Sequence, residues 1–270
     1  MRPLLRTLVA AATVSAAART AHAQPALSGD VGFNSQFIWR GVTSTNRLVI
    51  QPEMMLDAPL GALTFTVGAW GNIEPARYDG PRDLSSLGGL PGPFITQSQL
   101  WTEVSGSVAK RVDATFGVQG YLYPHVGNLA DYNSVELYSN VGIDGFISPT
   151  VSINYDVARI RGAYIEAGLS RAVSGERHGA VTVGAAAGFS AGQAEDSTGR
   201  DRAYFDRDGL THVDASGTAA FAIGRVTVAP EAHVIMPYDD LATVVAPGST
   251  RRTKLWFGTT LRWTTARDAR

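Results

Sequence analysis

The feature that most constrains this chain is an alternation of apolar and polar residues that recurs in segments of about ten residues. Near the C-terminus, Leu255, Phe257 and Leu261 fall on one face of an extended segment. Thr260 and Arg262 fall on the other face. Because successive side chains of a strand point to opposite sides, this period of two predicts strands with one apolar and one polar face.

The same alternation recurs along most of the chain. It predicts twelve strands, at residues 29–41, 47–58, 61–74, 97–109, 112–123, 134–145, 149–158, 162–173, 179–190, 210–223, 226–237 and 253–264. An even number of such strands, each with one lipid-compatible face, is typical of bacterial outer-membrane proteins. We therefore predict an all-β fold, an antiparallel up-and-down transmembrane β-barrel of about 12 strands.

The predicted connectors differ in length on the two sides of the barrel. The short set is 58–61, 110–111, 146–148, 174–178 and 224–225. The long set, rich in Gly, Pro, Ser and Asp, is 75–96, 124–133, 191–209 and 238–252. Two short connectors, 42–46 and 159–161, fall on the same side as the long set. Outer-membrane barrels carry short periplasmic turns and long extracellular loops, so the long set is predicted to face outward from the cell.

The N-terminal residues have the pattern of an export signal. Residues 1–23 combine Arg2 and Arg6 with an apolar stretch at 8–18 and a small-residue ending. This pattern predicts a cleaved signal peptide over 1–23 and one barrel domain over 24–270. The protein is thereby predicted to reach the bacterial outer membrane after export through the periplasm, where lipid surrounds it.

Composition argues against several classes of protein. The chain has 23 basic and 24 acidic residues, and the predicted signal contains no acidic residue, so the mature chain is more acidic than the full one. A nucleic-acid partner is therefore not expected. There is no cysteine, so neither a disulfide nor a thiolate nucleophile is expected.

Aromatic residues give a further test of the predicted barrel, because membrane barrels place aromatic girdles at both interfaces. The parity of the strands predicts outward aromatics at Phe65, Phe116, Phe221 and Trp263 on the periplasmic side and at Phe37, Trp39 and Phe189 on the loop side. The alternative interpretation is a soluble β-sandwich or barrel, in which the same alternation would point these side chains inward.

The polar face is predicted to line the lumen. Its candidate lumen or constriction residues are Arg40, Glu53, Trp70, Asn72, Glu103, Glu136, Glu166, Asp214, Glu231 and Arg262. An excess of carboxylates in a hydrated lumen concentrates cations. The pattern therefore favours a passive channel for small cationic or neutral solutes. The alternative is that these groups pair and fill the barrel, leaving a closed structural or surface-interaction protein.

A lipid-modifying hydrolase is a third, weaker interpretation. A two-residue turn at 224–225 would pair Ser216 with His233 and Thr218 with Glu231, on the face that also carries Asp214. A hydroxyl, an imidazole and a carboxylate in reach of one another can support nucleophilic catalysis. That cluster would face the lumen rather than lipid, so we predict no enzyme activity and assign no catalytic residue.

No cofactor or metal is predicted. The acidic segment 206–209, with Glu195, Asp196 and Asp201 upstream, lacks the alternating acidic spacing and terminal Glu of a calcium loop. A solvated acidic loop is the expected interpretation of this segment.

The first predicted hairpin resembles the N-terminal pattern of the TorF-like family of bacterial porins. The matching stretches are SQFIWRGVTSTN, which begins at Ser35, and GAWGN, which ends at Asn72. The resemblance implies an outer-membrane pore with no defined solute.

Within this motif, Arg40 is predicted to lie near the end of the first strand and to reach Glu53 on the second. Trp70 and Asn72 share the same inward face. We interpret this patch as an internal anchor or a constriction. The solute, the oligomeric state and the inward folding of any loop are not fixed by the sequence.

Overall fold

The fold is described from a computed structural model covering residues 24–76, 92–124, 133–173, 179–194, 205, 207–238 and 253–265. The predicted signal peptide, the greater part of the long connectors, the short connector 174–178, and Asp206 with the upstream Glu195, Asp196 and Asp201 lie outside these described residues. Within them, no helix is long and apolar enough to cross a membrane.

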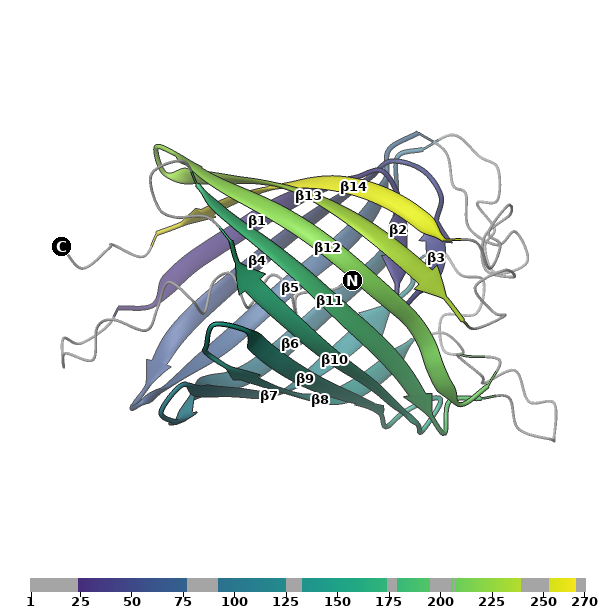
Figure 1. Ribbon diagram of the computed structural model, residues 1–270, viewed down its shortest axis with the longest axis horizontal. Helices are drawn as coiled ribbons and strands as arrows, with labels where there is room; N and C mark the ends of the chain where they lie inside the picture. Colours follow the sequence, from purple (N-terminus) through teal and green to yellow (C-terminus); the bar gives the residue numbers. More distant parts are fainter. Residues whose placement is uncertain are drawn as a thin grey trace.

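Twelve antiparallel strands form a closed barrel, in which each strand pairs with its neighbours and β1 closes the sheet against β14 and β4 (Figure 1). The barrel strands are β1 (Ala26–Asn34), β4 (Val49–Leu60), β5 (Leu63–Glu74), β6 (Phe94–Ala109), β7 (Val112–Leu122), β8 (Ser134–Ile143), β9 (Ser148–Asp156), β10 (Ala163–Ala172), β11 (Ala180–Ala191), β12 (Gly209–Ile223), β13 (Val226–Pro237) and β14 (Lys254–Thr264). The predicted fold class and strand number are confirmed.

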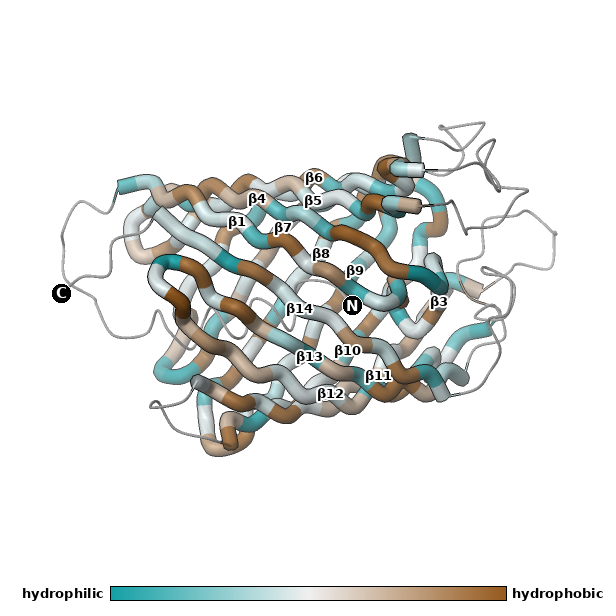
Figure 2. Tube along the Cα trace, turned by 90° about the horizontal axis from the view of Figure 1, so that it is seen from above, coloured by the Kyte–Doolittle hydropathy of each residue, from teal (hydrophilic) through white to brown (hydrophobic). Residues whose placement is uncertain are grey.

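The two faces of the barrel wall are opposite in polarity to those of a soluble protein. Leu100, Phe116 and Phe257 are 56%, 64% and 54% exposed on the outside. The polar His212 and His233, in contrast, are at most 1% exposed. Hydrophobic residues recur along the strands of the barrel (Figure 2), and many large apolar side chains are exposed on the outside. An apolar outer surface of this extent requires a membrane or another apolar partner, so the soluble-sandwich interpretation is wrong.

The first predicted strand, 29–41, is the one element that differs substantially from the structure. Strand β1 ends at Asn34, and the chain then forms a separate two-stranded hairpin, β2 (Phe37–Trp39) and β3 (Val42–Thr45). The segment 37–39 is apolar at every position, so it offers no polar face to a lumen. Such a segment is stable when it is buried on both sides.

The prediction of outward aromatic residues is accordingly correct for all four residues on the periplasmic side and for one of the three on the loop side. The outward side chains with 36% exposure or more include Phe65, Phe116, Phe189, Phe221 and Trp263. Phe37 and Trp39, which were predicted to face outward, are each 5% exposed and belong to the interior. They belong to the hairpin and not to the barrel wall.

Candidate functional site: a hairpin folded across the lumen

The β2–β3 hairpin, residues 37–45, turns on a two-residue loop at Arg40 and Gly41. Their φ angles are 51° and 84°. Two consecutive positive φ values are the geometry of a type I′ turn, whose twist matches that of the flanking strands. Glycine adopts this conformation freely, whereas arginine does so at a cost, so the position of Arg40 must be stabilised by its contacts.

One side of the hairpin packs against β5 and β7. The ring of Phe37 lies 5.6 Å from that of Trp70, and the ring of Trp39 lies 5.9 Å from that of Tyr121. The hydroxyl of Thr45 donates a hydrogen bond of 2.8 Å to Glu74. The hairpin is therefore held to this wall by ring packing and by a buried hydrogen bond.

The opposite side of the hairpin packs against β13 and β14. Ile38 forms a buried cluster with Ile235 and Trp256. The Lys254 ammonium donates a hydrogen bond to the Thr43 hydroxyl. Because contacts reach both sides, the hairpin crosses the lumen at the end that carries the long connectors.

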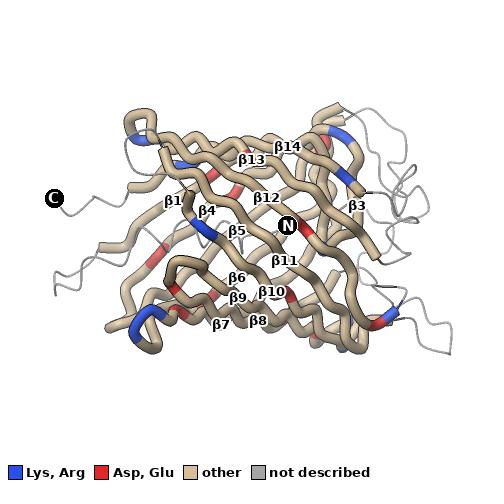
Figure 3. The backbone as a smooth tube through the Cα atoms, in the orientation of Figure 1, with Lys and Arg blue, Asp and Glu red and all other residues tan. Residues whose placement is uncertain are grey.

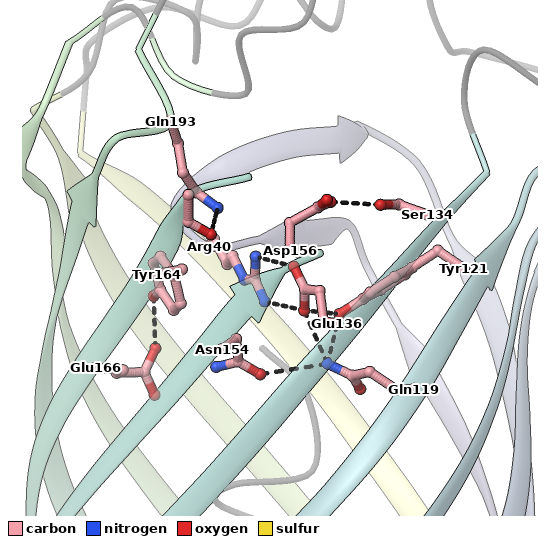
Figure 4. A network of polar contacts seen from close by, with 11 residues as sticks. Arg40, Gln119, Tyr121, Ser134, Glu136, Asn154, Asp156, Tyr164, Glu166 and Gln193 are labelled. Carbon is pink, nitrogen blue, oxygen red and sulfur yellow. Dashed lines mark hydrogen bonds and ion pairs between the residues drawn. The ribbon is translucent and has the colours of Figure 1, made fainter. Parts of the chain in front are cut away.

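The tip of the hairpin reaches the part of the wall formed by β8, β10 and β12. Arg40 makes a two-pronged ion pair with Glu136, with N–O distances of 2.8 and 2.7 Å (Figure 4). Its guanidinium carbon lies 4.1 Å from the centre of the Trp39 ring and 4.4 Å from that of Tyr164. A Cβ atom at position 41 would lie 2.6 Å from the Cβ of His212, so only glycine fits there.

The side chains around Glu136 form a pocket that we call the Arg40 receptor: Gln119, Tyr121, Glu136, Asn154 and Tyr164. The Tyr121 hydroxyl and the Gln119 amide each donate to Glu136 at 2.9 Å. Gln119 also donates to the Asn154 amide oxygen at 3.2 Å. Every one of these residues is at least nine-tenths buried.

The electrostatics of the pair keep Arg40 charged. Burial acts to lower the pKa of Arg40, but the Glu136 carboxylate, together with the Tyr121 and Tyr164 side chains, outweighs burial and holds the pKa above its ordinary value. A buried charge whose partner is removed is strongly destabilising. The Arg40–Glu136 pair therefore ties the tip to the wall.

A second polar cluster lies on β12 and β13. His233 Nδ1 lies 2.9 Å from an Asp214 carboxylate oxygen, and its Nε2 lies 3.6 Å from Glu231. The predicted register is correct, since Ser216 pairs with His233 and Thr218 with Glu231. Among the described residues, His233 Nε2 has no hydrogen-bond partner, so the Ser216 hydroxyl is not hydrogen-bonded to this nitrogen.

Toward the end with short turns, the wall of β9 to β12 is lined by small side chains. We call this stretch the small-residue wall: Thr150, Gly168, Gly184 and Ser216, all of them partly exposed. The facing stretch of wall, in contrast, carries a buried aromatic cluster that includes Trp70, Trp101, Tyr121 and Tyr138. The interior is therefore lined by bulky side chains along one stretch of wall and by small ones along the other.

The predicted lumen residues are distributed over these regions. Glu53, Trp70, Asn72, Glu136 and Asp214 are buried in the interior, while Glu103, Glu166, Glu231 and Arg262 are partly exposed. Acidic residues lie along the strands, whereas many basic residues lie at strand ends and turns (Figure 3).

Some of these residues have identified partners on neighbouring strands. Glu103 accepts a hydrogen bond of 2.5 Å from Tyr138, and Arg262 lies 3.8 Å from Asp30. Asn72 accepts a hydrogen bond of 2.9 Å from Gln51. Glu103, Arg262 and Asn72 are therefore each partnered within the barrel wall.

The expected Arg40–Glu53 pair is wrong. The hairpin carries Arg40 away from β4 and across to Glu136 on β8, 96 residues further along the chain. The sequence interpretation also missed Tyr164, although its position two residues before Glu166 places both side chains on one face, where the hydroxyl donates a 2.8 Å hydrogen bond.

Within the described part of the chain, no group of His, Asp and Glu side chains has the arrangement of a metal site. The described residues provide no site to which a metal role can be assigned.

No protein-family model and no curated protein matches the chain. Solved structures share its fold. One is an outer membrane channel from Pseudomonas putida F1, with a TM-score of 0.54 and 10% identity, covering 92% of this chain and 99% of that one. Another is the NanC porin, with a TM-score of 0.50 and 7% identity, covering 88% and 98%. The chain therefore has the fold of porin-like outer-membrane barrels, while its TorF-like membership stays a prediction.

Proposed function

We propose that this protein is a narrow channel of the bacterial outer membrane, admitting small cationic or neutral solutes and restricted by the β2–β3 hairpin. The observation that carries the proposal is the negative net charge of the side chains that face the interior. Inward-facing carboxylates outnumber inward-facing cations; the carboxylates are Asp30, Glu53, Asp57, Glu74, Glu103, Glu136, Asp156, Glu166, Asp214 and Glu231, and the cations are Arg40, Lys254 and Arg262. A low-dielectric wall focuses the field of these groups and favours cations.

The small-residue wall supports the route that a solute would take. It leaves room beside the partly exposed Glu166 and Glu231, on the side of the interior away from the aromatic cluster. Lipid is the partner of the outer surface, and small ions or solutes are the partners of the interior. Export through the periplasm by way of residues 1–23 belongs to the same proposal.

A closed barrel is the second candidate, and a specific observation favours it. The hairpin residues Phe37, Ile38, Trp39, Val42, Thr43 and Thr45 are all at most 5% exposed. A hairpin buried on both sides blocks much of the lumen at its level. In this alternative the long connectors, and not the lumen, carry the function.

Single-channel recording in a planar bilayer under a salt gradient tests the proposal. The channel predicts small discrete steps with a reversal potential that favours cations. Protease protection of reconstituted vesicles shows whether the protein is inserted. The absence of conductance steps from inserted protein would contradict the channel and favour the closed barrel.

A further inference from the structure

We propose that the Arg40 receptor is a binding site for guanidinium-bearing solutes, and that Arg40 occupies it as an internal substitute for such a solute. The inference rests on the proposed channel function for its physiological setting. It identifies the class of solute that opens the hairpin. The geometry that supports it lies in the wall of the barrel and not in the hairpin.

The receptor is organised without Arg40. Glu136 is held by the hydroxyl of Tyr121 and by the amide of Gln119, which is itself oriented by Asn154 (Figure 4). Tyr121 also accepts a hydrogen bond of 2.8 Å from Gln119. Because these contacts come from β7, β8 and β9, the carboxylate keeps its position when the hairpin tip withdraws.

The shape of the site selects a planar fork over a point charge. Both oxygens of Glu136 are engaged, one by each terminal nitrogen of the guanidinium. The ring of Tyr164 covers one face of the group at 4.4 Å. A guanidinium satisfies a two-pronged carboxylate and an aromatic face together, whereas an ammonium does not match this geometry.

Charge balance explains why such a solute would be needed. Withdrawing the tip removes Arg40 from Glu136 and leaves an interior carboxylate without its cation, which is unfavourable. A solute cation restores the balance. Glu136 is therefore paired with a cation both before and after the exchange, first with Arg40 and then with the solute. The positive φ of Arg40 adds a backbone cost to the docked tip, which favours the exchange.

The first experiment measures binding to the emptied receptor. Arg40→Ala protein in detergent is titrated calorimetrically with methylguanidinium and with methylammonium. We expect methylguanidinium to bind about ten-fold more tightly, and the preference to vanish in Arg40→Ala/Glu136→Gln. Arg40→Ala/Glu103→Gln, which alters a carboxylate outside the receptor, should keep it. Equal binding of the two cations to folded Arg40→Ala would overturn the inference.

The second experiment records the wild-type chain in a planar bilayer, and Glu136→Gln is its control. Methylguanidinium should raise the open probability several-fold over methylammonium at the same concentration and ionic strength. Glu136→Gln should open without this dependence. An equal response of the wild type to both cations would overturn the exchange.

The two proposals fail in different ways. If a chain lacking the hairpin is silent in the bilayer while Arg40→Ala binds methylguanidinium selectively, the channel function is wrong and the binding site stands. If that chain conducts but neither binding nor gating distinguishes the two cations, the channel stands and the guanidinium site is wrong.

Discussion

The two ends of the barrel interior are built on opposite principles. At the end with the long connectors, the hairpin, the aromatic cluster and the Arg40 receptor fill the space with buried, partnered groups. Toward the other end, the small-residue wall carries short, partly exposed side chains. One wall pattern, with its polar side inward, thus produces a filled interior at one end and a lining of small side chains toward the other, and the hairpin lies only at the filled end.

Replacing the hairpin gives the largest expected effect. A chain in which residues 36–46 are replaced by a Gly/Ser linker should show conductance steps roughly ten-fold larger than the wild type, because the narrowest level of the lumen loses its filling. Single-channel recording measures this. Equal step sizes in the two proteins would mean that the hairpin does not limit passage.

Removing the charge at the tip gives the next effect. Arg40→Ala leaves Glu136 buried without its cation and should lower the free energy of unfolding by about 3 kcal/mol. Urea unfolding in detergent micelles, followed by tryptophan fluorescence, measures the change. Arg225→Ala, at an exposed turn, is the matched control and should be near neutral. A neutral Arg40→Ala would show that the pair does not anchor the tip.

Adding a side chain at the turn, where it closely approaches β12, should lower the free energy of unfolding by a smaller amount. Gly41→Val places a branched side chain against His212 at a φ of 84° and should cost about 2 kcal/mol. The same unfolding assay measures it. Gly61→Val is a useful comparison, because its φ of 64° is similar but no atom lies within 4 Å of its Cβ position. Equal costs would mean that backbone conformation alone, and not the docked tip, is responsible.

Neutralising two partly exposed carboxylates of the interior gives the smallest effect. Glu166→Gln together with Glu231→Gln should lower the cation-to-anion permeability ratio about two-fold, because two partly exposed carboxylates lose their charge. Reversal potentials under a salt gradient measure it. Glu103→Gln, whose carboxylate is bonded to Tyr138 beside the aromatic cluster, should change the ratio less. A larger effect of Glu103→Gln would place the solute route along the aromatic side.

The strands could be predicted from the sequence because lipid on one side and polar groups on the other impose a period of two at nearly every position. The pairing of Ser216 with His233 followed in the same way, from a two-residue turn at 224–225. These features are local, so neighbouring residues specify them.

The hairpin could not be placed by the same reasoning. Phe37 and Trp39 keep the apolar parity of β1 and only Ile38 departs from it, so the segment looks like a continuation of that strand. The Arg40-Gly41 pair was the available signal, since a two-residue turn between alternating segments marks a hairpin. The choice of Glu136 over Glu53 depends on closure of the barrel, which brings distant strands face to face and leaves no local trace.

The most direct test of the central claim, that the hairpin lies inside the lumen, is thiol accessibility. The chain contains no cysteine, so a single introduced cysteine reports its own surroundings. Thr43→Cys, at a position that is 1% exposed, should react orders of magnitude more slowly with a charged thiol reagent than Asn46→Cys, at an exposed position. Both should react equally after unfolding. Equal rates in the folded, membrane-inserted protein would contradict the account.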